Sequence, residues 1–235
     1  MTTDPHLDES VHTLVSADAP HTVVVFCHGR GASAASVEPL AQAIARPGVA
    51  VLAPQAAPIG GVRQWYPNSF LAPLAANEPA LSGALDAVGR AVEEARALGV
   101  ADSQVVLAGF SQGACLAAEY AARHARRWGG VVALSGALIG TGEAEDSAPR
   151  PELAGAGGVY PDKTFEYGDD LAGTSVFLGC SERDPHIPLA RLERSAEVLA
   201  DLGGDVTKRV YPGSTHGVVD DEVRFVRELL DYLAC

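Results

Sequence analysis

The residues with the clearest chemical potential lie in Gly109-Phe110-Ser111-Gln112-Gly113, where an apolar run ends and an alanine-rich helical pattern begins. This stretch matches G-x-S-x-G, in which a serine on a sharp strand-to-helix turn projects as a nucleophile. The glycines leave room for the neighbouring backbone, and the start of a helix supplies amide donors and a positive dipole end beside the serine. A tight packing turn is the alternative interpretation. The pattern predicts that Ser111 is a nucleophile.

A serine hydroxyl needs a base that takes its proton, and the chain has seven histidines. His216 lies between the last predicted strand and the last predicted helix, which places it at the same edge of a parallel sheet as Ser111. Asp184 follows the preceding predicted strand and is expected to orient the imidazole. Asp220 and Asp221 are nearer to His216 in sequence, but they begin a predicted helix and are expected to act as charges at its N-terminus. The order Ser111, Asp184, His216 is the order expected of α/β-hydrolases.

A hydrolase of this kind also needs two donors for the oxyanion that develops during attack. We expect one to be the backbone N–H of Gln112 and the other to be the main chain of Arg30, in the loop after the first parallel strand. His28 is expected to pack beneath that loop. A phosphate-binding role for the loop is disfavoured, because it has neither G-x-G-x-x-G nor a P-loop lysine. Four further histidines are expected on the surface: His6, His12, His21 and His124.

These residues must be positioned by elements that alternate between strand and helix. Apolar runs predict strands at 22–27, 49–53, 104–110, 130–135, 175–180 and 206–211, and helical patterns occupy 33–46, 80–98, 112–127, 188–202 and 220–233. The alternation predicts an α/β fold with a mostly parallel central sheet and helices on both faces, as a single domain over residues 1–235. Two irregular segments, 54–79 and 136–173, are candidate substrate-binding or lid segments.

Composition narrows the classes of partner. The formal net charge of −13 argues against a phosphate backbone and an anionic membrane surface as partners, so we expect no nucleic acid and no stable membrane association. The polar, acidic N-terminus does not resemble a signal or transit peptide, so a cytoplasmic location is expected. The four cysteines follow no metal-binding or redox spacing, and no metal is expected.

Six motifs, taken together and in order, resemble the phospholipase/carboxylesterase family of α/β-hydrolases: CHGRGAS, WYPNSF, GFSQGACL, ALSG, SERDPHIP and YPGSTHGVVDDE. The resemblance covers about residues 22 to 233 of a family that includes acyl-protein thioesterases and small bacterial carboxylesterases. It implies a triad of Ser111, Asp184 and His216 with oxyanion amides at Arg30 and Gln112. It also implies hydrolysis of carboxylic or thio esters through an acyl-enzyme, without a cofactor.

The favoured function is a serine carboxylesterase acting on small acyl esters. Loop position predicts that substrate enters past Trp65, Phe70 and Leu71, with Ile187 and Val218 beside the triad loops. An acyl-thioesterase, a lysophospholipase, a lactone hydrolase similar to the dienelactone hydrolases and a non-catalytic binding module remain alternatives. The dienelactone hydrolases carry cysteine where this chain has serine. The thioesterase branch is similar to HGLGD where this chain has HGRGA, which argues against an acyl-protein substrate. The expected partner is a small-molecule ester, and the oligomeric state stays open, a homodimer included.

Overall fold

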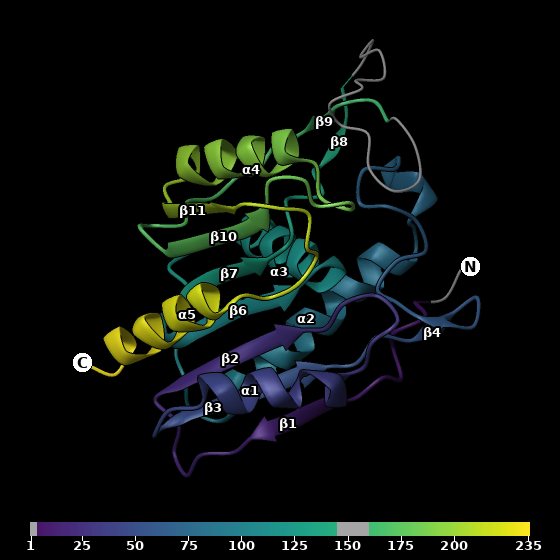
Figure 1. Cartoon of the computed structure of the whole chain (residues 1–235). Helices are drawn as coiled ribbons and strands as arrows, with labels where there is room; N and C mark the ends of the chain where they lie inside the picture. The colour runs from purple at the N-terminus through teal and green to yellow at the C-terminus, as the bar shows by residue number, and fades with distance from the viewer. Residues whose placement is uncertain (1–3, 145–159) are drawn as a thin grey trace.

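The central element of the computed structural model is a seven-stranded sheet with the strand order β1-β3-β2-β6-β7-β10-β11 (Figure 1). The structure describes residues 4–144 and 160–235. All neighbouring strands run parallel except β1, which pairs antiparallel with β3 at one edge. In order across the sheet the strands are Val11–Val15, Val49–Pro54, Thr22–Cys27, Val105–Phe110, Gly130–Leu134, Ser175–Ser181 and Asp205–Tyr211. The predicted mostly parallel α/β sheet is confirmed.

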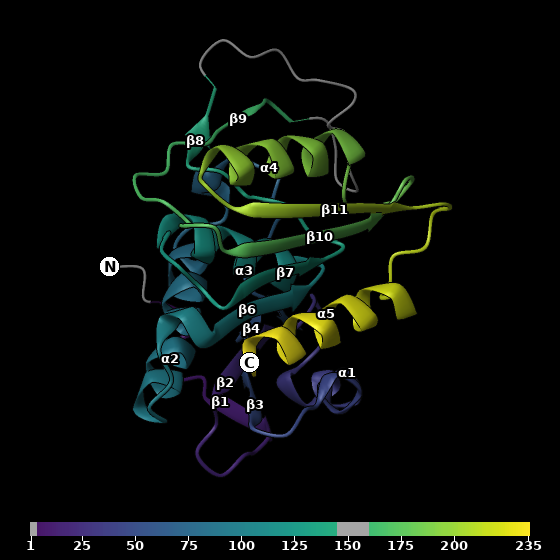
Figure 2. The same ribbon diagram turned by 90° about the vertical axis from the view of Figure 1, so that its left-hand side faces the viewer.

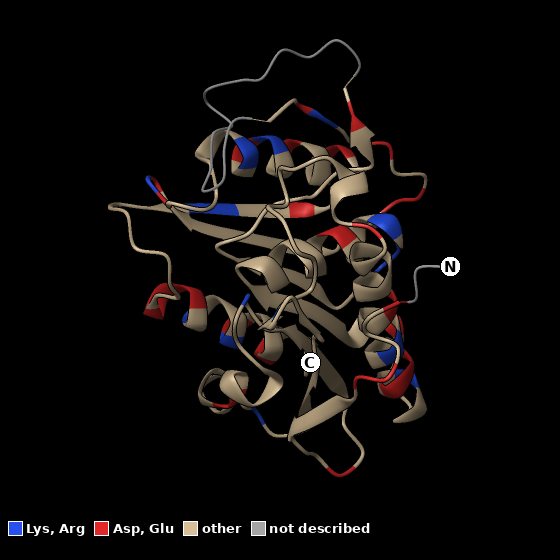
Figure 3. Ribbon diagram, turned by 90° about the vertical axis from the view of Figure 1, so that its right-hand side faces the viewer, with Lys and Arg blue, Asp and Glu red and all other residues tan. Residues whose placement is uncertain are grey.

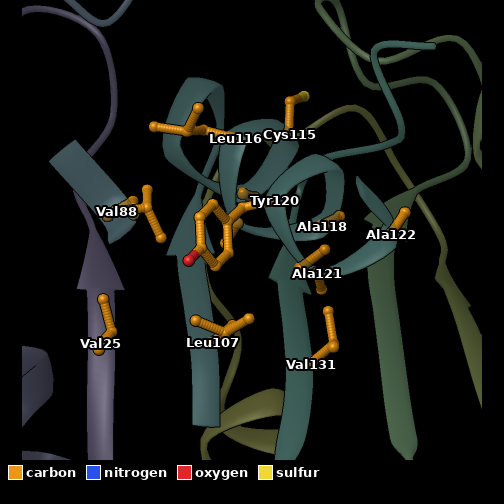
Figure 4. Close-up of a cluster of buried hydrophobic side chains, with 14 of the residues drawn as sticks. Val25, Val88, Leu107, Cys115, Leu116, Ala118, Tyr120, Ala121, Ala122 and Val131 are labelled. Atoms are coloured by element: carbon orange, nitrogen blue, oxygen red, sulfur yellow. The ribbon is translucent and has the colours of Figure 1, made fainter. Parts of the chain in front are cut away.

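Helices cover both faces of the sheet, as Figures 1 and 2 show. On one face, α1 (Glu38–Ile44) and α5 (Asp220–Leu233) pack against one apolar cluster. On the other face, α2 (Ala80–Ala97), α3 (Gln112–Arg123) and α4 (Leu189–Asp201) pack against a larger cluster. Figure 4 shows part of the larger cluster, in which Leu116 and Tyr120 of α3 lie over Val25, Leu107 and Val131 of three neighbouring strands.

Short elements occupy the connections between the main strands and helices. In the described part of the chain, β4 (Pro58–Ile59) pairs antiparallel with β5 (Val62–Arg63), and β8 (Gly142–Glu143) pairs antiparallel with β9 (Lys163–Thr164). Among the same residues, short 3-10 turns form η1 (Ala34–Val37), η2 (Leu74–Ala76) and η3 (Asp102–Gln104).

The five inner strands contain no charged residue, and charge is confined to the helices, the connections and the edge strand β11 (Figure 3). Strands buried on both faces cannot hydrate a charged side chain, so an uncharged run is what a covered parallel sheet requires. Within the described residues, no helix is both long enough and apolar enough to cross a membrane.

Strand β1 and helices α1 and α3 differ from the sequence-based expectation. The helix expected over 33–46 is the 3-10 turn η1 followed by the shorter α1. Strand β1 was not predicted, because it has only five residues, is partly exposed and follows a polar stretch. Helix α3 ends at Arg123 rather than near residue 127, because His124 leaves helical geometry and the chain turns to bury Trp128 ahead of β7. Of the irregular segment 136–173, which is expected to be a candidate lid, residues 145–159 lie outside the described part of the chain.

Candidate active site

Ser111 occupies the turn between β6 and α3 with φ 55° and ψ −121°, a backbone conformation that non-glycine residues rarely adopt. The glycines on either side of this turn, Gly109 and Gly113, leave no room for a side chain. A methyl group on Gly113 would overlap the carbonyl oxygens of Cys27 and His28, and one on Gly109 would overlap the backbone of Gly113. The turn therefore lets helix α3 begin directly against strand β2, with the serine projecting at its N-terminus.

Ser111, His216 and Asp184 form one chain of hydrogen bonds. Ser111 Oγ lies 2.8 Å from His216 Nε2, and His216 Nδ1 lies 2.7 Å from Asp184 Oδ2. Because an ionised carboxylate can only accept, Nδ1 carries the proton and donates it to Asp184, which leaves Nε2 as the acceptor for the serine hydroxyl. The imidazole is thus held in the tautomer that can remove the serine proton.

Asp184 is kept ionised by its hydrogen bonds. Its side chain is fully buried, and burial alone would raise its pKa. The hydrogen bond from His216 and the amides of His186 (2.8 Å) and Ile187 (3.1 Å) outweigh that effect, so the pKa of Asp184 lies below its ordinary value. An ionised carboxylate in this position can stabilise an imidazolium when the base takes a proton.

The loops that carry Asp184 and His216 are tied to each other. Ser181 Oγ donates to the carbonyl oxygen of Thr215 at 2.6 Å, and the Arg183 amide donates to that of Gly213 at 3.0 Å. The His216 ring packs against Phe110, at a centroid distance of 5.1 Å, and against His186, at 4.7 Å. The imidazole is therefore fixed by packing as well as by hydrogen bonds.

His28 holds the loop that follows β2. Its ring is 1% exposed, its Nδ1 donates to the Gly29 carbonyl at 2.8 Å, and its Nε2 accepts the Ala56 amide at 3.1 Å. Burial lowers its pKa to about 4, so the ring is neutral at physiological pH and serves as a fixed donor and acceptor. The expectation that His28 packs beneath this loop is confirmed.

The same loop is braced by the segment 54–79. The Arg30 guanidinium donates to the Gln64 side chain and to the carbonyl oxygens of Tyr66, Pro67 and Asn68. From the nucleophile side, the Gln112 side chain accepts the Trp65 amide at 2.9 Å and donates to the Tyr66 carbonyl at 2.7 Å.

The side chains of Arg30 and Gln112 are thus committed to structure, while their main-chain amides donate to no residue that the structure describes. Amides free at the two loops that flank Ser111 are available to a negative oxygen.

A pocket of about 510 Å³ opens at Ser111. Its exposed rim includes Arg30, Asn68 and His186, and its buried end includes Tyr66 and Cys115. The remaining lining residues are Gly29, Ala32, Pro67, Ser69, Phe70, Phe110, Ser111, Gln112, Ile187 and His216. Across residues 4–144 and 160–235, no group of three or more His, Cys, Asp or Glu side chains is arranged to hold a metal ion.

Comparisons with known proteins show the family of the chain. A family model described as Phospholipase/Carboxylesterase matches residues 9–151. The chain belongs to the phospholipase/carboxylesterase family. A crystal structure of a phospholipase/carboxylesterase from Dyadobacter fermentans DSM 18053 is 35% identical and superposes with a TM-score of 0.80 over 98% of each chain. The family is one of hydrolases, and the resemblance expected from the six motifs is confirmed.

Two further relatives extend the comparison. Acyl-protein thioesterase 1 from Gibberella zeae is 30% identical over 132 residues, a match that spans 56% of this chain and about half (49%) of the relative. The crystal structure of esterase PE8 is 24% identical, with a TM-score of 0.72 over 97% of this chain and 100% of that one, a likeness that shows the fold alone.

Of the five residues expected to contact substrate, two line the pocket and three do not. Phe70 and Ile187 line the pocket. Trp65 does not, because its indole is fully buried and donates to the His28 carbonyl at 2.7 Å. Leu71 is buried in the core, and Val218 is 36% exposed outside the pocket lining.

Sequence reasoning missed two buried polar residues near the site. His6, expected on the surface, is fully buried, donates from Nε2 to the Trp65 carbonyl and accepts the Ala57 amide, each at 2.9 Å. Tyr66 lines the inner end of the pocket. The only signal for Tyr66 was its place in the motif WYPNSF, which does not reveal the direction of the side chain.

Proposed function

We propose that this protein is a serine carboxylesterase that hydrolyses small carboxylic esters through an acyl-enzyme. The observation that carries the proposal is the continuous chain of hydrogen bonds from Asp184 through His216 to Ser111, which ends in an open pocket. A serine with a positioned imidazole and an orienting carboxylate is the arrangement that activates a hydroxyl for acyl transfer.

In the proposed reaction, Ser111 Oγ attacks the ester carbonyl carbon while His216 Nε2 takes the hydroxyl proton. The carbonyl oxygen becomes an oxyanion that the Arg30 and Gln112 amides stabilise. When the carbon–oxygen bond to the alcohol breaks, His216 returns the proton to the leaving alcohol. Water then adds to the acyl-enzyme, with His216 again as base, and release of the carboxylic acid restores Ser111. Asp184 holds the imidazole throughout.

Labelling with a fluorophosphonate tests the nucleophile. In the expected reaction, Ser111 Oγ bonds to phosphorus, fluoride leaves and His216 takes the serine proton, so the wild type becomes covalently labelled. Ser111→Ala should not label, whereas the control Ser82→Ala, at an exposed position of α2, should label as the wild type does. Failure of the wild type to label, or equal labelling of Ser111→Ala, would show that the assignment is wrong and would favour a non-catalytic module.

A thioesterase is the second candidate, because the same attack cleaves thioesters and one relative is an acyl-protein thioesterase. A chain-length series of p-nitrophenyl esters, measured beside an acyl-CoA and a lysophospholipid, separates the candidates. Short esters should give the highest kcat/KM. A preference for long-chain thioesters would replace the small-ester proposal with the thioesterase. We also propose a cytoplasmic location and a small-molecule partner rather than nucleic acid or a membrane, which the net charge of −13 supports.

A further inference from the structure

The inner end of the pocket contains a hydroxyl group without a partner. Tyr66 lines the pocket and is 1% exposed, and its hydroxyl makes no hydrogen bond in the part of the chain that the structure describes. A buried hydroxyl is nearly always paired, since leaving it unpaired forfeits its hydrogen bonds to water. Burial also raises the pKa of Tyr66 above its ordinary value, so the phenol keeps its proton and is a donor.

The neighbours of this hydroxyl are already committed or weak. The Cys115 thiol lies beside it, but sulfur is a weak acceptor and Cys115 Sγ already receives the Ala137 amide at 3.4 Å. Glu119, one turn further along α3, is fully buried and accepts hydrogen bonds from Arg123, from Tyr167 and from the Ile139 and Gly140 amides. Tyr66 therefore brings to the pocket wall a phenol hydroxyl that, among the described residues, has the weak acceptor Cys115 Sγ beside it and no oxygen or nitrogen partner.

The reaction decides which part of the substrate reaches this donor. His216 returns its proton to the leaving alcohol, so the alcohol must lie on the His216 side, next to the exposed His186. The acyl group stays on Ser111 and takes the other side, towards Cys115. Cys115 follows Ser111 by four residues, which corresponds to a rise of about 6 Å along α3. At about 1.5 Å for each carbon–carbon bond, that distance corresponds to an acyl chain of roughly four bonds.

We propose that Tyr66 is a specificity-determining residue whose hydroxyl donates to an oxygen on the acyl chain, so that the preferred substrates are esters of short acids bearing a carbonyl or hydroxyl oxygen near the fourth carbon. The proposal rests on the esterase function proposed above. A neutral oxygen suits the subsite better than a carboxylate, because the buried Glu119 lies behind it and opposes a second negative charge.

The test compares two esters that differ at one carbon, p-nitrophenyl pentanoate and p-nitrophenyl 4-oxopentanoate. In the wild type, the ratio of their kcat/KM values should favour the oxo ester. Tyr66→Phe removes only the hydroxyl and should lower that ratio about 5- to 30-fold, the range expected for one buried hydrogen bond. The melting temperature of Tyr66→Phe should equal or exceed that of the wild type, because the hydroxyl has no protein partner to lose.

Tyr167→Phe is the matched control. Tyr167 is partly buried, its hydroxyl donates to the buried Glu119 at 2.9 Å, and it lies outside the pocket lining, so this variant should lower the melting temperature and leave the ratio unchanged. An unchanged ratio in Tyr66→Phe, or a lower melting temperature, would overturn the inference.

Fluorophosphonate labelling of Tyr66→Phe separates failure of the inference from failure of the esterase proposal. If Tyr66→Phe is still labelled but its ratio of kcat/KM values equals that of the wild type, only the proposed role of Tyr66 is rejected. A wild type that neither labels nor hydrolyses either ester overturns both.

Discussion

Glu222 offers a test of how the His216 loop is held. This carboxyl is 1% exposed at the start of α5, where Oε2 accepts the Val219 amide at 2.9 Å, three residues after His216. Oε1 has no partner among the described residues and lies against Gly179 of β10. Burial, and to a smaller degree the charge of Asp221, raises the pKa of Glu222 to about 7, although the Val219 hydrogen bond opposes the rise.

The raised pKa fixes the sign of a stability change. Glu222 is protonated in both the folded and unfolded chain below about pH 4.5, and between about 4.5 and 7 only the unfolded chain releases the proton. The free energy of unfolding therefore falls across that window and stays low above it. At about 1.36 kcal/mol for each pKa unit, the gap from the ordinary 4.5 to about 7 corresponds to about 3 kcal/mol.

Glu222→Gln removes the titration and keeps an acceptor for the Val219 amide. Relative to the wild type, the variant should gain about 3 kcal/mol in free energy of unfolding between pH 4.5 and pH 8. Urea unfolding at several pH values measures this difference, in which the titrations shared by both proteins cancel. Glu228→Gln makes the same change of charge at an exposed position of α5 and should show almost no pH-dependent difference. A flat difference for Glu222→Gln would show that the carboxyl is ionised without penalty and would refute the reasoning.

Two further changes test the site. Gly113→Ala places a methyl group against the Cys27 and His28 carbonyl oxygens and should lower the free energy of unfolding, measured in urea, by about 2 kcal/mol or more. The control Gly168→Ala adds a methyl group in open space and should change that free energy by less than about 0.5 kcal/mol. Equal effects of the two substitutions would contradict the close approach of α3 to β2. Asp184→Asn should lower kcat by roughly 10³- to 10⁴-fold on a p-nitrophenyl ester, because the amide no longer selects the tautomer with Nε2 free; retained kcat would exclude an orienting role for Asp184.

The fold and the triad geometry were predictable because they depend on local signals. Ser111, Asp184 and His216 each follow an apolar strand, and the carboxyl ends of parallel strands share one edge, so knowing the strands was enough to bring the three side chains together. The same logic failed at β1, whose short and partly exposed strand has no apolar run to mark it.

The pocket wall was not predictable, because its residues are positioned by contacts between distant parts of the chain. Trp65 looked like a substrate contact on a loop, yet its indole donates to His28, 37 residues away. His6 looked like a surface residue, yet it accepts the Ala57 amide across 51 residues. Neither partner has a sequence signature, and the direction of each side chain follows from the path of the segment 54–79.

These long-range hydrogen bonds separate the residues that hold the site together from the residues that line its pocket. Arg30, Trp65 and Gln112 join the loop after β2, the segment 54–79 and the start of α3 through hydrogen bonds that leave the proposed oxyanion amides unpaired. Changing any of these side chains would disturb the oxyanion geometry together with the pocket wall. Phe70, Ile187 and the Tyr66 hydroxyl line the pocket without side-chain hydrogen bonds to that framework. Under the proposed function, substrate preference can therefore change at those positions while the hydrogen bonds that join Ser111, His216 and Asp184 stay intact.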